Sequence, residues 1–234
     1  MSSAKGIAHC FGCGKTWGPI NFIMERRTLT FVEACKHLGD LYGIKWDETE
    51  PTPEELAARF EREQLFRAND FAAEFFREQY KLSEAAQKYA QGRWSDAIIE
   101  EWGIGYAPHK NALLRYAKDK KANIEDLIKA GLIKVSGEDG HYYDAFIGRL
   151  MFRTGNLVGF SGRTINPKKN AEGKEPPKYL NTAETPIFKK GETLFGYFEA
   201  QRIAARRDML NIVEGQPDVI RLASIDQQNT VAPM

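Results

Sequence analysis

The chain has 234 residues, of which 42% are hydrophobic and 28% are charged, and its formal net charge is +1. This composition is that of a folded protein with a sizeable core, and it excludes a disordered chain, which combines low hydrophobicity with a high net charge. No stretch approaches 18 consecutive apolar residues and the start lacks a signal-peptide core, so we expect a cytoplasmic protein with no membrane partner.

The charge is divided unevenly along the chain. Residues 45–105 contain fourteen acidic and eight basic residues, whereas residues 145–210 contain twelve basic and six acidic residues. A basic region of this kind is typical of a surface that binds phosphates, because Lys and Arg hold them with release of counterions. A solvated basic face explains the same charge, so charge alone leaves nucleic-acid binding open.

The first expected feature is a metal-binding knuckle at Cys10 and Cys13, which are separated by two residues. With three cysteines in the chain, a disulfide framework is excluded, and this spacing indicates metal or redox chemistry. We interpret the pair as half of a zinc site, because structural zinc takes four ligands. Helices are expected next over 20–26 and 30–43, and the acidic, proline-containing segment 47–53 is the best candidate for a linker between domains.

The middle of the chain changes from helical to strand periodicity. Residues 54–93 follow a helical pattern whose aromatic residues we expect in the core. Further helices are expected over 95–101, 111–118 and 124–130, and a short strand is expected over 102–108. Strands are then expected over 132–135, 150–153 and 157–160, with a turn at 153–156.

The last third of the chain ends in a strand that leads into a helix. A polar loop at 168–177 and a helix over 194–206 are expected first. Residues 209–213 have the pattern of a buried strand, which runs into Glu214 and Gly215 and then a helix from Asp218. Open α/β sheets place functional groups at such a carboxyl end of a strand.

Several short motifs occur in the order found in bacterial-type DNA primases. They are HCFGCG at 9–14, FVE at 31–33, IGYAP at 104–108, GRLMF at 148–152, GFSGR at 159–163, PKYLNT at 177–182, FKKG at 188–191 and LFG at 194–196. The segment IVEGQPD at 212–218 resembles the opening motif of a topoisomerase-primase (toprim) domain. The chain therefore resembles this family over nearly its whole length, and is incomplete at both ends relative to it.

The resemblance implies an α+β fold of several parts. Residues 1–46 would be half a zinc ribbon with a helical tail, and 47–69 a linker and helix. Residues 70–207 would form the mixed α/β N-terminal subdomain of the primase catalytic core, and 208–234 the first βα unit of a toprim domain.

The resemblance also implies catalytic carboxylates. Glu214 would be the acid/base or metal-associated glutamate of nucleotidyl transfer, with Mg²⁺ or Mn²⁺ as catalytic ions. Asp218 would support it. The alternatives are that Glu214 is a helix-start residue stabilised by the helix dipole, and that Asp218 merely lies in the first turn of the helix.

Five polar residues fall within the motifs that line the family's active-site groove. They are Arg149, Arg163, Lys178, Asn181 and Lys190. The resemblance implies contacts with the template, with the RNA–DNA hybrid and with the incoming triphosphate. The alternative for each basic residue is a role in surface solubility.

The implied function is synthesis of short RNA primers on a single-stranded DNA template. Its partners would be the template, the RNA primer and nucleoside triphosphates, with a replicative helicase and single-stranded-DNA-binding protein recruited through absent C-terminal regions. We expect this chain alone to be inactive, because the aspartates of later toprim strands are missing. The other zinc ligands, a Cys and a His, are also missing.

Three other functions stay open. The chain could be a truncated, inactive module that binds single-stranded DNA, or the primase part of a phage or plasmid primase-helicase. Another toprim enzyme, a topoisomerase or a nuclease, would not be expected to carry the zinc-ribbon knuckle together with the PKYLN motif.

Overall fold

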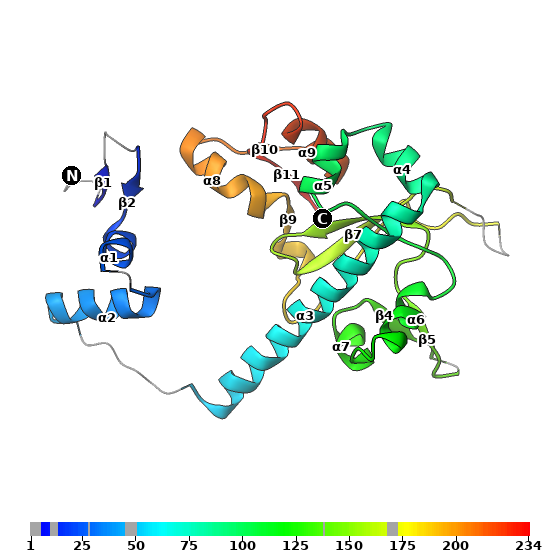
Figure 1. Ribbon diagram of the computed structural model, residues 1–234, viewed down its shortest axis with the longest axis horizontal. Helices are drawn as coiled ribbons and strands as arrows, with labels where there is room; N and C mark the ends of the chain where they lie inside the picture. Colours follow the sequence, from blue (N-terminus) through cyan, green and yellow to red (C-terminus); the bar gives the residue numbers. More distant parts are fainter. Residues whose placement is uncertain (1–5, 10–13, 28, 45–50, 138, 168–172) are drawn as a thin grey trace. The chain divides into compact units, whose positions relative to one another are not determined.

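The computed structural model describes residues 6–9, 14–27, 29–44, 51–137, 139–167 and 173–234 (Figure 1). The chain forms two compact units, Met1–Pro53 and Glu54–Met234. Within the described ranges, no helix is both long enough and apolar enough to cross a membrane.

The N-terminal unit consists of an antiparallel hairpin and two helices: β1 (Ala8–His9), β2 (Thr16–Trp17), α1 (Pro19–Arg27) and α2 (Phe31–Tyr42). Helix α2 begins after Thr30, whose hydroxyl accepts the N–H of Glu33, while the Glu33 carboxylate accepts the N–H of Thr30 at 2.8 Å. This capping box satisfies two amides that the helix itself leaves unpaired. Gly43 ends the helix in a left-handed conformation. The two helices expected at 20–26 and 30–43 are confirmed.

Three helices open the C-terminal unit: α3 (Pro53–Leu82), α4 (Glu84–Gln91) and α5 (Asp96–Glu101). Ser83 and Ser95 start the two short ones, because each hydroxyl accepts an N–H of the first turn. Helix α3 is continuous across residue 70, where we expected one region to end and the next to begin. Leu65 and Phe76, on either side of that position, belong to the same buried core.

The centre of this unit is a four-stranded antiparallel sheet in the order β3-β6-β7-β8. Its strands are β3 (Gly105–Ala107), β6 (Arg149–Thr154), β7 (Gly159–Thr164) and β8 (Tyr179–Asn181). Successive side chains of a strand point to opposite faces. Leu150 and Phe152 accordingly belong to one core and Met151 to another, so both faces of the sheet are covered.

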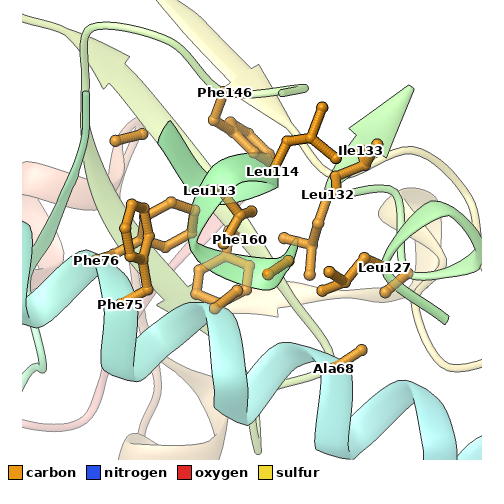
Figure 2. Close-up of a cluster of buried hydrophobic side chains, with 14 of the residues drawn as sticks. Ala68, Phe75, Phe76, Leu113, Leu114, Leu127, Leu132, Ile133, Phe146 and Phe160 are labelled. Carbon is orange, nitrogen blue, oxygen red and sulfur yellow. The ribbon is translucent and has the colours of Figure 1, made fainter. Parts of the chain in front are cut away.

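The first core lies between α3, the sheet and a group of smaller elements: α6 (Ala112–Asp119), α7 (Ile124–Lys129) and the hairpin β4 (Ile133–Val135) with β5 (Tyr142–Asp144). Figure 2 shows Phe75 and Phe76 of α3 beside Leu113 of α6 and Phe160 of β7. The rings of Phe76 and Phe160 meet edge to face at 5.4 Å. Most aromatic residues of 54–93 are therefore at least partly buried, as their helical spacing predicted, whereas Phe60 is 63% exposed and is not a core residue.

The C-terminal elements are η1 (Lys190–Glu192), β9 (Leu194–Phe195), α8 (Tyr197–Arg207), β10 (Asn211–Ile212), α9 (Gln216–Ala223) and β11 (Thr230–Pro233). Of these, β9, α9 and β11 share the second core, on the opposite face of the sheet, with α4 and α5. Strands β10 and β11 are parallel and α9 connects them, with β9 antiparallel on the other side of β11. Val219 and Ile220 of α9 share this core with Leu150 of the sheet. Packing of α9 on that core brings the toprim-like segment against the central sheet.

Two expected strands differ from those observed. The strand expected at 157–160 exists but is displaced, because Leu157 adopts a left-handed φ of 59° inside the turn and β7 runs from Gly159 to Thr164. The expected buried strand at 209–213 shortens to Asn211–Ile212, and Ile212 is 69% exposed. Strand β10 pairs only with β11 among the described residues, so its apolar side chains are not enclosed.

The helix expected over 194–206 begins later, at Tyr197. Leu194 and Phe195 form strand β9 instead, and Gly196 separates the two elements with a φ of 81°. A Cβ at Gly196 would lie 2.7 Å from Val219 Cγ1, so the close approach of α9 requires glycine there.

Candidate nucleotide and nucleic-acid site

Arg163 is held on the sheet by two aromatic rings. It lies on β7 directly opposite Tyr179 of β8, and its Nη1 donates to the Tyr179 hydroxyl at 2.9 Å. The guanidinium carbon lies 5.6 Å from the ring centre of Tyr89 and 5.4 Å from that of Tyr179. Such contacts stabilise a cation and fix its plane. Burial raises the pKa of Tyr179, so its hydroxyl stays protonated beside Arg163.

Arg163 and Asp218 line one pocket of about 390 Å³, between the sheet and the start of α9. Its lining residues are Gly92, Arg93, Trp94, Arg163, Pro217, Asp218 and Arg221. Two predicted residues from different motifs, GFSGR and IVEGQPD, therefore line the same pocket. Asp218, which follows Glu214 by four residues, lines this pocket together with the arginine of the GFSGR motif.

Sequence reasoning missed the other two arginines of this pocket. Arg221 Nη1 donates to the carbonyl oxygen of Arg93 at 2.9 Å, and the Arg93 guanidinium lies 3.8 Å from the ring centre of Tyr89. Arg93 belongs to the net acidic segment 45–105. Nothing in the local sequence indicated that it would join a basic site.

Glu214 lies between β10 and α9, and its side chain is exposed, as is that of Asp218. Neither carboxylate forms an ion pair with a residue that the structure describes. Both are therefore available to a ligand. No contact between Glu214 and Arg163 is found.

The described residues do not make a divalent-metal site by themselves. They contain no group of three or more His, Cys, Asp or Glu side chains that could hold an ion. A pair of ions bridging a triphosphate and a hydroxyl needs several carboxylates, and Glu214 and Asp218 are two. The present arrangement therefore supports no step that passes through such an ion.

Lys178 and Asn181 lie on or next to the edge strand β8. The carbonyl oxygen of Lys178 accepts the N–H of Thr164 at 3.0 Å, and its side chain is exposed. Asn181 lies opposite Ser161, and Asn181 Oδ1 and Ser161 Oγ are both buried without a hydrogen-bond partner in the described structure. Unsatisfied buried polar atoms are costly, so this pair lowers the stability of the sheet locally.

Lys190 lies apart from these residues, at the start of η1. Its side chain is exposed, and its backbone N–H donates to the Glu184 carboxylate at 3.0 Å. No contact between Lys190 and Arg163 is found, so the structure does not join Lys190 to the pocket.

Arg149 has a structural position that differs from the one we expected. It is 4% exposed, and its Nη1 donates to the carbonyl oxygens of Gly162 and Pro177, each at 3.0 Å. Burial lowers the pKa of its guanidinium. Its neighbour Leu150 faces the core on the Arg163 side, so Arg149 lies on the opposite face of the sheet. Arg149 supports the sheet and is not accessible to a phosphate.

Cys10 and Cys13 lie outside the described residues. The strands on either side of them, β1 and β2, pair as a hairpin in which His9 Nδ1 and Thr16 Oγ1 are 2.8 Å apart.

Comparison with known families decides the ancestry of the chain. Residues 75–201 match the model of the DNA primase catalytic core, N-terminal domain, and residues 1–54 match that of the CHC2 zinc finger. The chain belongs to the bacterial DNA primase family. The DNA primase of Salmonella typhimurium is 34% identical over 243 residues, which cover 100% of this chain and 40% of that protein. The DNA primase of Deinococcus radiodurans is 36% identical, over 95% of this chain and 37% of its own length.

Solved primase structures share the fold. The Aquifex aeolicus primase, comprising its zinc-binding and RNA polymerase domains, is 30% identical with a TM-score of 0.64 over 99% of this chain and 55% of that one. A DnaG primase catalytic domain bound to single-stranded DNA is 31% identical with a TM-score of 0.65, over 75% of this chain and 57% of that one. The expected α+β primase fold is confirmed, and the chain spans about two fifths of the length of the curated primases it matches.

Proposed function

We propose that this chain is part of a cytoplasmic nucleotidyltransferase that synthesises short RNA primers on single-stranded DNA from nucleoside triphosphates. The observation that carries the proposal is the pocket that is lined by both Asp218 of α9 and Arg163 of the central sheet. A carboxylate beside fixed guanidinium groups suits a reaction in which phosphates must be held and their charge balanced.

Within this proposal, the basic residues hold polynucleotide or triphosphate oxygens. Arg163 is the best placed, because Tyr179 and Tyr89 orient its donors. Lys178 and Asn181 on the sheet edge would contact the template backbone, and Lys190 would reach the same strand or the primer. Glu214 would accept the proton that the attacking hydroxyl loses, or would help carboxylates from outside the described set to hold Mg²⁺ or Mn²⁺.

The wider parts of the proposal rest on the relatives. A relative's catalytic domain is known bound to single-stranded DNA, which supports template binding by this unit. We propose Cys10 and Cys13 as two of the four ligands of a zinc site, on the strength of the CHC2 match. A replicative helicase and a single-stranded-DNA-binding protein remain proposed partners through other regions.

A second candidate function is DNA binding without synthesis. The specific observation in its favour is that the described residues offer two site carboxylates and no larger acidic cluster. This module would bind single-stranded DNA in a salt-dependent manner and make no primer.

The test joins this chain to the remaining toprim strands of the Salmonella typhimurium primase and measures primer synthesis and DNA binding. We expect Glu214→Gln to abolish synthesis and to leave the DNA dissociation constant unchanged, because the amide keeps the shape of the side chain and loses its charge. Glu175→Gln, at an exposed position away from the pocket, is the matched control and should stay active. Wild-type synthesis by Glu214→Gln would end the catalytic assignment, and binding without synthesis by the unmutated fusion would favour the second function.

A further inference from the structure

One residue that lines the pocket between the sheet and α9 carries a buried donor that has no acceptor. Trp94 lines it, is 3% exposed, and its indole N–H makes no hydrogen bond within the described structure. A buried indole N–H usually has a partner, since leaving it unpaired costs about 1–3 kcal/mol. The ring itself is fixed by an edge-to-face contact with Phe152 at 6.1 Å.

We propose that Trp94 and Arg221 complete, with Arg93 and Arg163, a binding site for a phosphate group. This inference rests on the proposed function and names two residues that act in the same site. Indole and guanidinium groups only donate hydrogen bonds, so the natural occupant is an anion with several acceptor oxygens. Asp218 is the single acid in the lining, against three arginines.

Arg221 is suited to two tasks at once. One N–H of its guanidinium already donates to the carbonyl oxygen of Arg93, which leaves other donors of the planar fork for a ligand. It lies one helical turn after Asp218 on α9, so both side chains reach the pocket from the same side of the helix. No ion pair with a described carboxylate occupies Arg221.

The three arginines are held by different elements, which makes the site a preformed one. Arg163 comes from β7, Arg221 from α9, and Arg93 from the turn after α4, where its own Nη1 donates to the carbonyl oxygen of Tyr89 at 2.8 Å. A phosphate would replace repulsion among neighbouring guanidinium groups with charge-assisted hydrogen bonds. We expect Arg221 to contribute through both its charge and its fork geometry.

The test is titration of the ¹⁵N-labelled 234-residue chain with inorganic pyrophosphate, followed by NMR. Trp94→Phe identifies the Trp94 indole N–H signal. We expect this signal to shift during the titration, because the orphan donor acquires an acceptor, and Arg221→Ala to weaken binding about tenfold, the usual loss for one charge-assisted hydrogen bond.

Two further variants separate charge from structure. Arg221→Gln can still donate to the Arg93 carbonyl oxygen without a charge, and should bind pyrophosphate about as weakly as Arg221→Ala. Arg221→Lys keeps the charge without the fork and should be intermediate. Arg206→Ala, at an exposed arginine of α8, should bind like the wild type.

An indole signal that stays fixed at saturating pyrophosphate would overturn the inference for Trp94. Wild-type affinity in both Arg221→Ala and Arg221→Gln would overturn it for Arg221. If Arg163→Ala loses binding in that case, the proposed function survives without Arg221. Absence of pyrophosphate binding in the wild type would remove the phosphate site, while primer synthesis by the fusion protein would still be judged separately through Glu214.

Discussion

Asp144 illustrates how a single buried residue organises this fold. It is 3% exposed, and its two carboxylate oxygens accept the N–H groups of Leu113 and Leu114, each at 2.9 Å. Burial raises the pKa of Asp144, and the hydrogen bonds from the two amides oppose this effect. Asn111, which precedes α6 with a left-handed φ of 52°, makes no capping bond itself, so Asp144 caps the helix from β5.

Replacing Asp144 by alanine should destabilise the C-terminal unit. Two buried amides would lose their acceptor, and we expect the free energy of unfolding in urea to fall by about 3 kcal/mol. The control Asp139→Ala removes an exposed carboxylate and should change the free energy of unfolding by less than about 0.5 kcal/mol. Equal effects of the two substitutions would mean that the cap does not stabilise the fold.

At the scale of elements, the approach of α3 to the sheet depends on one glycine. A Cβ placed on Gly105 of β3 would lie 2.6 Å from Phe76 Cβ and 2.9 Å from the Phe76 carbonyl carbon. Real Cβ atoms do not come this close to backbone, so any other residue would push the helix from the strand.

We therefore expect Gly105→Ala to lower the free energy of unfolding by about 1–3 kcal/mol, the usual cost of overpacking a core. Gly191→Ala is the control, because no atom lies within 4 Å of the added methyl group. Thermal unfolding monitored by circular dichroism measures the stability of both variants. A Gly105→Ala variant as stable as Gly191→Ala would show that α3 can shift without loss.

At the scale of the whole molecule, the fold brings arginines from the acidic and the basic segments of the chain together around one pocket. Arg163 comes from the basic region and Arg93 from the acidic one, yet both line the same hollow with Arg221. The net charge of each segment therefore predicted the contribution of Arg163 to this basic site but not that of Arg93.

Single-stranded DNA binding by this chain should report on that site. We expect Arg163→Ala to weaken binding and to reduce the slope of log affinity against log salt by about 0.7, the value for one phosphate contact on a single strand. Arg59→Ala removes an exposed arginine of α3 from the acidic segment and should leave the slope unchanged. Fluorescence anisotropy at several salt concentrations measures this, and an unaltered slope in Arg163→Ala would exclude a phosphate contact there.

Local signals in the sequence determined the start and end of many helices. Thr30 and Ser95 cap helices whose starts were predicted, whereas the break at Ser83 between α3 and α4 was not predicted. The motif series was sufficient to identify the family. The strands β8 and β11 escaped prediction because three or four residues carry too little periodicity. The strand β7 was misplaced because Leu157 is apolar yet lies in a turn.

The sequence by itself determined that this is a folded α+β chain of the primase family, with Glu214, Asp218 and the basic motifs as candidates. Only the tertiary structure decided which of them meet. Arg149 and Arg163 lie in similar motifs but on opposite faces of the sheet. Arg149 donates to backbone carbonyl oxygens, whereas Arg163 lines the pocket beside α9. Arg93 and Arg221, 128 residues apart, join because α4 and α9 pack on the same core. Such contacts depend on packing between distant segments, which no local pattern of residues encodes.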